Sequence, residues 1–167
     1  TLGNVVDPFA LVKKYGADPV RYYLLREIAS AEDGDYSEEK FVGRYNADLA
    51  NGLGNLVSRV FTLADKRGEF QNDIAADLEK EVADKIASTK DAVIKHTVEF
   101  RFNDALASLW ELVAYGDKFV NDRKPWAEAD NRKTLINALT IISNVAELLA
   151  PFLPSTAEKI TQGIIWS

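Results

Sequence analysis

Three polar side chains at four-residue spacing are the first group in this sequence that could do chemistry. Asn51, Asn55 and Arg59 fall in a stretch whose apolar residues recur every three or four positions, which is typical of an amphipathic helix. On such a helix the three side chains form one row. Amide and guanidinium groups present paired hydrogen-bonding atoms in fixed directions, which suits recognition of base edges. The alternative is an ordinary solvated helix surface, and the row alone does not decide between the two.

Trp126 is the second such group, because it stands outside the regular apolar spacing. It directly follows Pro125, which ends a helix, and Arg123 and Lys124 precede that proline. A tryptophan in this position either covers the core or stands exposed as a platform on which an unpaired base stacks. In the second case the two neighbouring cations favour an anionic partner.

The remaining residue types argue for binding rather than catalysis. The chain has no cysteine and only one histidine, His96, which excludes thiolate chemistry and zinc or di-iron sites that need several such ligands. The acidic run of Glu79, Glu81 and Asp84 has no partner group and is interpreted as a solvated face. We therefore expect no catalytic residue and no metal-binding residue in this chain.

The elements that must position these residues are all expected to be helices. Capping residues Asp7, Asp18 and Ser37, together with glycines, prolines and apolar periodicity, predict helices over about 8–16, 18–28, 38–67, 102–120 and 131–149. Another helix is expected to begin near 78, and Ser155 is expected to cap a short last one. No convincing strand pattern occurs, apart from a short extended piece near 34–36. The predicted fold is all-α, an antiparallel helix bundle over 37–167 that follows a linking segment over 1–36. Gly52 and Gly54 lie inside the helical pattern and are interpreted as a place where another helix approaches closely.

The length of the chain fits one globular domain, and its charges are unevenly distributed along the sequence. The chain has 167 residues, 47% hydrophobic side chains and a formal net charge of −6. Residues 31–39 and 69–84 carry −5 each, which leaves +4 for the rest, so a locally basic surface is permitted. No apolar stretch is long enough for a membrane span. The complete absence of methionine indicates a fragment of a larger protein.

Several motifs spread over the chain can be compared with a known family. They are the opening TLGNVVDP, the stretch YGADPVRYYL over 15–24, NADLAN over 46–51 with GNL and SR over 54–59, KPW over 124–126, and LLAPFLP over 148–154. Together they resemble the C-terminal helical anticodon-binding domain of class I methionyl-tRNA synthetases. In this resemblance Thr1 stands at the last position of the family's Lys-Met-Ser-Lys-Ser catalytic loop.

The resemblance implies a role for each candidate residue. Trp126 corresponds to the tryptophan that stacks on the first anticodon base, and Asn55 and Arg59 match polar residues that help read the CAU anticodon. Asn51, one turn earlier, is the weaker candidate. The partner is then the methionine tRNA, tRNA(Met), and the function is recognition of its anticodon loop. Possible tRNA backbone contacts come from a wider set of cations: Lys13, Lys14, Arg21, Arg26, Arg123 and Lys124.

The resemblance also implies what lies elsewhere in the parent protein. The catalytic domain would precede Thr1, and with it the binding of ATP, Mg and methionine and the usual zinc (Zn) insertion of this ligase. The fragment itself would need no cofactor and form no adenylate. Segment 1–36 would couple the catalytic domain to the bundle, and the protein would be cytoplasmic.

Two alternatives stay open. The chain could be the helical domain of another class I synthetase, for cysteine, leucine, isoleucine or valine, although the set of Asn55, Arg59 and Trp126 argues against this. It could also be a helical protein-interaction module in which an exposed Trp126 enters a groove of another protein. Dependence of binding on the anticodon distinguishes these cases.

Overall fold

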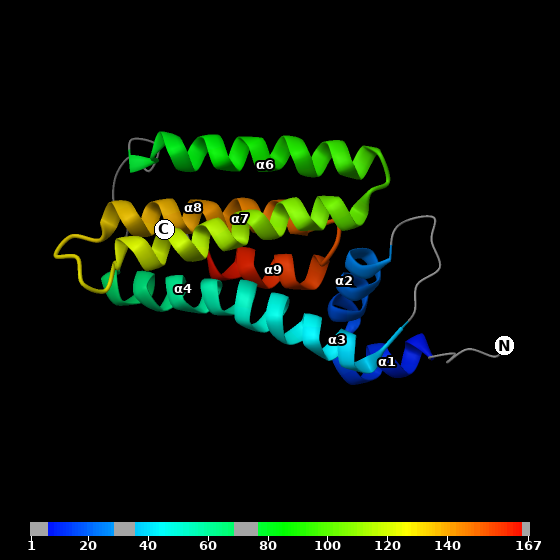
Figure 1. Cartoon of the computed structure of the whole chain (residues 1–167). Coiled ribbons are helices and arrows are strands. Elements are labelled where there is room, and N and C mark those ends of the chain that lie inside the picture. Colours follow the sequence, from blue (N-terminus) through cyan, green and yellow to red (C-terminus); the bar gives the residue numbers. More distant parts are fainter. Residues whose placement is uncertain (1–6, 29–35, 69–76, 165–167) are drawn as a thin grey trace.

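Helices make up the regular structure of the described part of the chain (Figure 1). The computed structural model describes residues 7–28, 36–68 and 77–164. The elements are α1 (Pro8–Tyr15), α2 (Ala17–Glu27), α3 (Glu38–Arg44), the π-helix η1 (Tyr45–Gly54), α4 (Asn55–Arg67), α6 (Lys80–Val98), α7 (Phe102–Arg123), α8 (Arg132–Leu149) and α9 (Pro154–Gly163). The predicted all-α class is confirmed. The extended piece expected near 34–36 falls outside the described residues except for Tyr36, as does most of the linker over 69–77.

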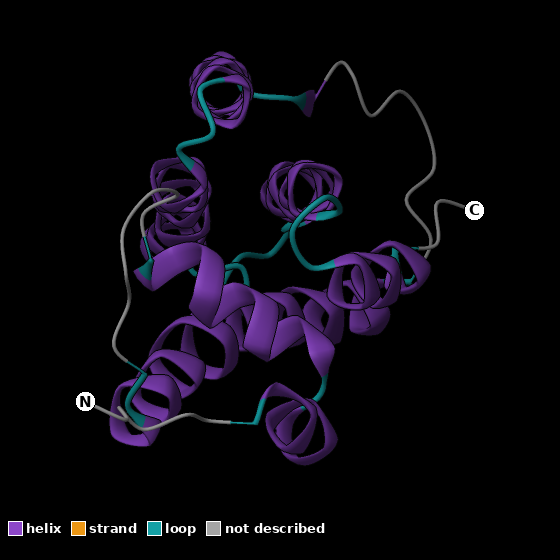
Figure 2. Cartoon of the chain, turned by 90° about the vertical axis from the view of Figure 1, so that its right-hand side faces the viewer, coloured by secondary structure: helices purple, strands orange, loops and turns teal. Residues whose placement is uncertain are grey.

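The long helices run side by side and reverse direction from one to the next. In Figure 1, α4, α6, α7, α8 and α9 form this bundle, and α1, α2 and α3 lie at one end of it. Figure 2 views the bundle from that end, with the long helices seen nearly along their axes. Helix α7 packs against α2, η1, α4, α6 and α8 and is the central element. The loop between α7 and α8, residues 124–131, lies at the opposite end.

The core is built mainly from α7 and α8. Every position of α8 from Thr134 to Leu139 is buried, while α7 buries one stripe that includes Leu109, Leu112 and Val120. Gly116 of α7 permits the closest approach, because a Cβ atom there would lie 3.0 Å from Ile141 of α8 and 3.1 Å from Leu56 of α4. Burial of apolar surface stabilises the fold by about 25 cal/mol per Å², so the contact between α7 and α8 contributes to stability along the whole length of both helices.

The helix predicted over 38–67 is continuous but not uniform. Its middle third is η1, in which hydrogen bonds span five residues and the turn is wider than in an α-helix. Trp110 of α7 packs against this segment and donates its indole N–H to the carbonyl oxygen of Asp48 at 3.3 Å. Gly52 faces the same indole, as expected for a close approach, whereas a Cβ atom at Gly54 would meet only the carbonyl oxygen of Leu49 in its own helix.

Local capping signals are confirmed at α1 and α3 and wrong at α2 and α9. Asp7 accepts a hydrogen bond from the amide of Phe9, and Ser37 accepts one from the amide of Lys40. In contrast, α2 already begins at Ala17, so Asp18 lies inside it. Ser155 lies inside the first turn of α9, and Leu153, the residue at the N-cap position of that helix, makes no capping hydrogen bond with its side chain. The reason is a contact between these two helices.

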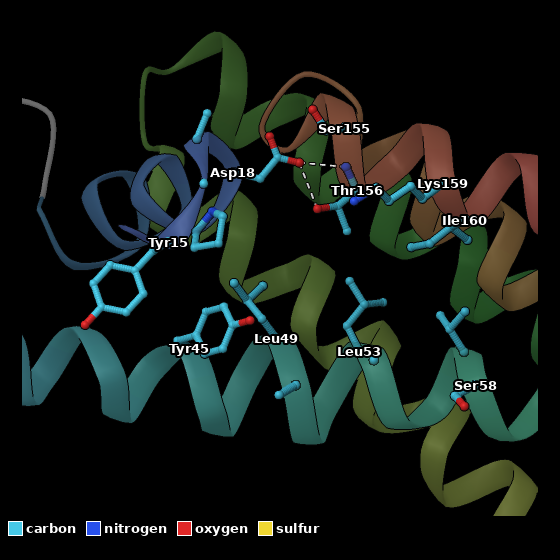
Figure 3. Close-up of a pocket in the computed structure, with 16 residues that line it drawn as sticks. Tyr15, Asp18, Tyr45, Leu49, Leu53, Ser58, Ser155, Thr156, Lys159 and Ile160 are labelled. Atoms are coloured by element: carbon cyan, nitrogen blue, oxygen red, sulfur yellow. Dashed lines mark hydrogen bonds between the residues drawn. The ribbon is translucent and has the colours of Figure 1, made fainter. Parts of the chain in front are cut away.

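Two side chains of α2 hold the corner between α8 and α9; we call Asp18 and Arg21 the α2 clamp. The carboxylate of buried Asp18 accepts hydrogen bonds from the amide and the hydroxyl of Thr156, at 2.6 and 2.8 Å (Figure 3). Arg21 donates to the carbonyl oxygens of Phe152 and Pro151, at 2.7 and 3.0 Å. The carboxylate thus meets the N-terminus of α9, where a negative charge suits the helix dipole, and the guanidinium holds the turn that follows α8.

The other residues of α2 divide between two clusters. Val20 and Tyr23 pack with Phe41 of α3 in a small cluster of their own. Tyr22 belongs to the main core, where its ring lies 4.6 Å from that of Trp110 and its hydroxyl donates to the Asp48 carboxylate at 2.7 Å. Burial, and then this hydrogen bond, raises the pKa of Tyr22. The linking segment is therefore joined to the bundle through α2, and the domain boundary at residue 36 stays a prediction.

Candidate nucleic-acid interface

Arg59 is held in place by two side chains of α7. Its Nη1 donates to the amide oxygen of Asn121 at 2.7 Å and its Nη2 to the carboxylate of Asp117 at 2.5 Å. Asn121 in turn donates to Asp117 at 2.9 Å, which closes a triangle of three side chains. The Arg59 side chain is 25% exposed, and its Nε is buried without a hydrogen-bond partner in the described part of the chain. The guanidinium is therefore oriented, and Asp117 balances its charge.

The two asparagines of the predicted row are exposed. Asn55 is the first residue of α4 and lies one turn before Arg59. Asn51 belongs to η1, where the wider turn shifts its position relative to α4. Neither side-chain amide has a hydrogen-bond partner among residues 7–28, 36–68 and 77–164. The structure thus brings Asn55 and Arg59 together and leaves Asn51 at the edge of the row.

Trp126 is exposed, so its alternative role as a cover of the core is wrong. The side chain is 54% exposed, whereas Pro125 beside it is buried. The loop 124–131 has a defined path, because Lys124 takes a left-handed conformation at φ 51° and its carbonyl accepts from the amide of Ala127 at 2.8 Å. Asn131 donates its amide to the carbonyl of Pro125 at 2.9 Å. The tryptophan is presented by a turn that is fixed on both sides.

The same loop is tied to the C-terminal end of α4. Arg67 lies 3.0 Å from the amide oxygen of Asn131 and 3.0 Å from the carboxylate of Asp130. Arg59 and Arg67 both belong to α4 and stand eight residues apart, so the triangle of Arg59 lies about 12 Å along α4 from the residue that holds the loop of Trp126. We call Asn55, Arg59, Asn121, Lys124 and Trp126 the α4–α7 surface.

The two cations expected beside Trp126 differ in their availability. Arg123 donates to the Glu79 carboxylate at 2.6 Å, and Lys133 lies 3.6 Å from the same group. Glu79 is therefore a half-buried ion-pair partner, which corrects its interpretation as a solvated residue. Lys124 is exposed and has no ion pair within the described ranges. Lys124 is the cation better placed for an external phosphate.

The four cations of the linking segment lie at the other end of the bundle. Lys13 is exposed, and Lys14 bonds to the carboxylate of Glu38 at 2.7 Å. This contact raises the pKa of Lys14 and lowers that of Glu38. Arg21 is occupied by the α2 clamp, and Arg26 is half-buried. Because α1 and α2 are remote from loop 124–131 in Figure 1, these cations and Trp126 do not share one surface.

A cavity of about 610 Å³ lies between the α1–α2 junction, η1 and α9 (Figure 3). Tyr15, Tyr45, Leu49 and Ile160 supply much of its lining, and the Asp18–Thr156 contact borders it. No residue of the α4–α7 surface takes part in this lining. The cavity is therefore separate from the candidate site.

The described ranges contain no cluster of three or more His, Cys, Asp or Glu side chains that could hold a metal ion. The zinc expected for the parent protein therefore has no ligand set in these residues. None of the described helices is both long and apolar enough to cross a membrane.

Sequence reasoning found the exposed tryptophan and the amide–guanidinium row, but not their supports. Asp117, Asn121 and Arg67 were missed because each acts across helices that are distant in the sequence. Asp117 and Asn121 do stand four residues apart on the exposed side of α7, which was the one signal available.

Comparison with known proteins places this chain in a family. The model described as "Anticodon-binding domain of tRNA ligase" matches residues 79–165, just over half of the chain, and the chain belongs to this family. A second model, described as "tRNA synthetases class I (M)", matches residues 1–61.

Within that class the relatives are methionine–tRNA ligases. The enzyme of Clostridium acetobutylicum is 38% identical over 168 residues, which cover 95% of this chain and 26% of the relative. That of Thermotoga maritima is 37% identical and covers 96% of this chain and 27% of the relative. The methionyl-tRNA synthetase of Mycobacterium tuberculosis, solved in the apo form, superimposes with a TM-score of 0.81 at 32% identity over 93% of this chain and 34% of that chain. The chain thus spans about a quarter to a third of the length of these proteins.

Proposed function

We propose that this chain is the anticodon-recognition module of a methionine–tRNA ligase and that it binds the CAU anticodon loop of tRNA(Met). The observation that carries the proposal is the presence of both an exposed Trp126 in the α7–α8 loop and an oriented Arg59 on α4, the helix that holds this loop through Arg67. The family of the chain and the ligase activity named for its relatives support it.

The chemistry of the α4–α7 surface suits an unpaired loop. Unpaired bases stack on exposed aromatic rings for about 1–3 kcal/mol each, and their edges are read by paired donors and acceptors. Trp126 supplies the ring, while Asn55 and Arg59 supply directional hydrogen-bonding groups. Lys124 is placed to meet a phosphate next to the stacked base. Asn51 stays a weaker candidate at the edge of the surface.

In this proposal, the chemical steps of the ligase reaction belong to parts of the parent protein outside this chain. Activation of methionine with ATP and Mg would take place in a catalytic domain outside this chain, and the module would position the tRNA for it. The chain alone would then be a binding module without catalytic activity. The location we propose is the cytoplasm, where such a ligase serves protein synthesis.

The test is competition binding at low salt with two RNA stem-loops that differ only in the anticodon. We expect the CAU loop to compete for the chain at least about tenfold better than a loop with a changed anticodon, which corresponds to about 1.4 kcal/mol. Low salt is needed because contacts to phosphates weaken steeply with ionic strength.

Equal competition by both loops would contradict the proposal. Binding of a protein partner through Trp126 with no affinity for either loop would instead support a protein-interaction module. A stem-loop for cysteine, leucine, isoleucine or valine tRNA serves as the control for the other class I synthetases.

A further inference from the structure

Exposed apolar side chains gather at the end of the bundle that is far from Trp126. Of the eight large hydrophobic residues exposed in the described ranges, six belong to α1, α2 and the region where α6 turns into α7: Phe9, Val12, Leu24, Ile94, Val98 and Phe100. In Figure 1 these three elements lie at the same end, with α2 between α1 and the α6–α7 turn. Clustered exposed apolar surface of this kind marks an interaction site.

The strongest part of this surface is the α6–α7 turn. Ile94 and Val98 stand four residues apart on one face of α6, and Phe100 follows directly. Val98 is 73% exposed and Phe100 is 70% exposed. We call these three residues the turn patch. Glu99 and Arg101, which lie 3.4 Å apart in an ion pair, form its polar rim.

The backbone fixes Phe100 in this exposed position. The amide of Arg101 donates to the carbonyl of His96 at 2.8 Å, and that of Phe100 donates to the carbonyl of Thr97 at 3.1 Å. This pattern is a Schellman motif, in which the residue at the position of Phe100 is usually glycine because it takes a positive φ. Here φ is 58° on a phenylalanine. The strained backbone and the exposed ring are both unfavourable in the chain alone.

We propose that the turn patch is a docking surface for the catalytic part of the same parent protein. This inference rests on the proposed function, since it requires a parent with a catalytic domain. The patch would bind an apolar surface of that domain, in addition to whatever contacts the domain makes with α1.

Two observations favour this occupant over a second copy of the chain or an RNA. The relatives are three to four times longer than this chain, and residues 1–61, which include α1 and α2, match the synthetase model rather than the anticodon-binding model. Helix α1, near which the described part of the chain begins, lies at the same end of the bundle as the turn patch. An RNA is a poorer occupant, because Ile94 and Val98 offer neither positive charge nor hydrogen bonds and Arg101 at the rim is paired with Glu99 and Asp104. Phe100 alone would offer a base only a stacking surface.

The test uses cysteine labelling in the full-length protein, since residues 1–167 contain no cysteine. Val98→Cys is placed in the patch. Ala87→Cys is the matched control, because 11 residues bring it back to the same face of α6, about 16 Å away. The rate of maleimide labelling at each site is followed by peptide mass analysis in the 167-residue chain and in the full-length protein.

We expect position 98 to react at least about tenfold more slowly in the full-length protein than in the 167-residue chain, because labelling then requires the domains to separate. Position 87 should react alike in both. Equal rates at position 98 would overturn the proposal. Protection that appears in the 167-residue chain and is lost on dilution would also overturn it in favour of pairing between copies, as would protection that requires added tRNA.

A second variant separates docking from folding. Phe100→Gly removes the ring and supplies the residue that the left-handed position favours, so the 167-residue chain should melt at the same or a higher temperature. In the full-length protein the same change should restore about tenfold faster labelling at position 98. Competition by the CAU stem-loop should be unaffected, so failure here is distinguishable from failure of the proposed function.

Discussion

The guanidinium of Arg59 is oriented by neighbouring side chains of the same chain, without any bound partner. Asp117 and Asn121 hold one Nη each, and the Asp117 carboxylate balances the charge. In the proposed function, Arg59 is therefore suited to donating directed hydrogen bonds to a base edge rather than to attracting a phosphate by its charge. Lys124 is exposed and has no ion pair in the described ranges, so it is suited to attracting a phosphate.

This division predicts different effects on the salt dependence of binding. Lys124→Ala should weaken binding to all stem-loops alike and reduce the slope of log K against log salt by about 0.7, the value for one phosphate contact. Arg59→Ala should leave the slope unchanged and reduce the preference for CAU by about 1–3 kcal/mol. Titrations at several salt concentrations measure both quantities.

Because Arg59→Ala exposes the charge of Asp117, the double variant Arg59→Ala with Asp117→Asn is its control. If the double variant regains the preference for CAU, the loss came from Asp117, and base reading by Arg59 is wrong.

Trp126 allows a test in which folding and binding are separable. Trp126→Ala should cost about 1–3 kcal/mol of binding to the CAU stem-loop through loss of one stacked base. The free energy of unfolding should change by less than about 0.5 kcal/mol, because the side chain is 54% exposed. Urea denaturation followed by circular dichroism gives the second value. Trp126→Tyr should keep most of the affinity, and an unfolded Trp126→Ala would contradict the exposed placement.

At the scale of elements, the α2 clamp shows why local sequence signals fail where partners are distant. Asp18 was expected to cap the helix in which it lies, and Ser155 was expected to cap α9. In the structure, the carboxylate of Asp18 instead accepts hydrogen bonds from Thr156, 138 residues away. Nothing in the local pattern distinguishes these cases, since a carboxylate caps its own helix and another helix with the same chemistry.

Helix order and the main apolar stripes, in contrast, were predictable from the sequence. Leu109 and Val120, or Leu135 and Ile142, recur at helical spacing and are buried on one face. The π-helix was not predictable, because the steps of four between Tyr45, Leu49 and Leu53 fit either helix type. The candidate site was likewise only partly predictable. The position of Trp126 could be inferred from the sequence, whereas the hydrogen bonds from Arg59 to Asp117 and Asn121 of α7 could not.

Loss of the clamp should destabilise the corner between α8 and α9. Asp18→Ala leaves the amide and hydroxyl of Thr156 without their acceptor, which should cost about 1–2 kcal/mol of unfolding free energy. Urea denaturation measures this value. Glu39→Ala is a suitable control, because it removes an exposed carboxylate from the first turn of α3. A cost no larger than that of the control would contradict the clamp.

Across the whole molecule, Tyr22 joins α2, η1 and α7 and links stability to pH. Burial raises the pKa of its phenol above the ordinary value near 10. Above that pH the unfolded chain loses the proton first, so the contribution of Tyr22 is complete below pH 10 and declines as pH rises through the raised pKa. Tyr22→Phe should therefore cost about 1 kcal/mol at pH 8 and less at pH 11. Unfolding in urea at both pH values checks this; a cost that grows with pH would contradict it.

The α2 clamp has a practical consequence for exchanging parts between ligases. A chain that began at residue 37 would keep every residue of the α4–α7 surface, yet it would lose Asp18, Arg21 and Tyr22 together. The corner between α8 and α9 would then lose the hydrogen bonds of Asp18 and Arg21, and Trp110 would keep its hydrogen bond to Asp48 but lose the ring of Tyr22 beside it. A graft of the proposed anticodon module onto another catalytic domain should therefore include α2, because a cut after this helix removes its contacts with α7 and α9.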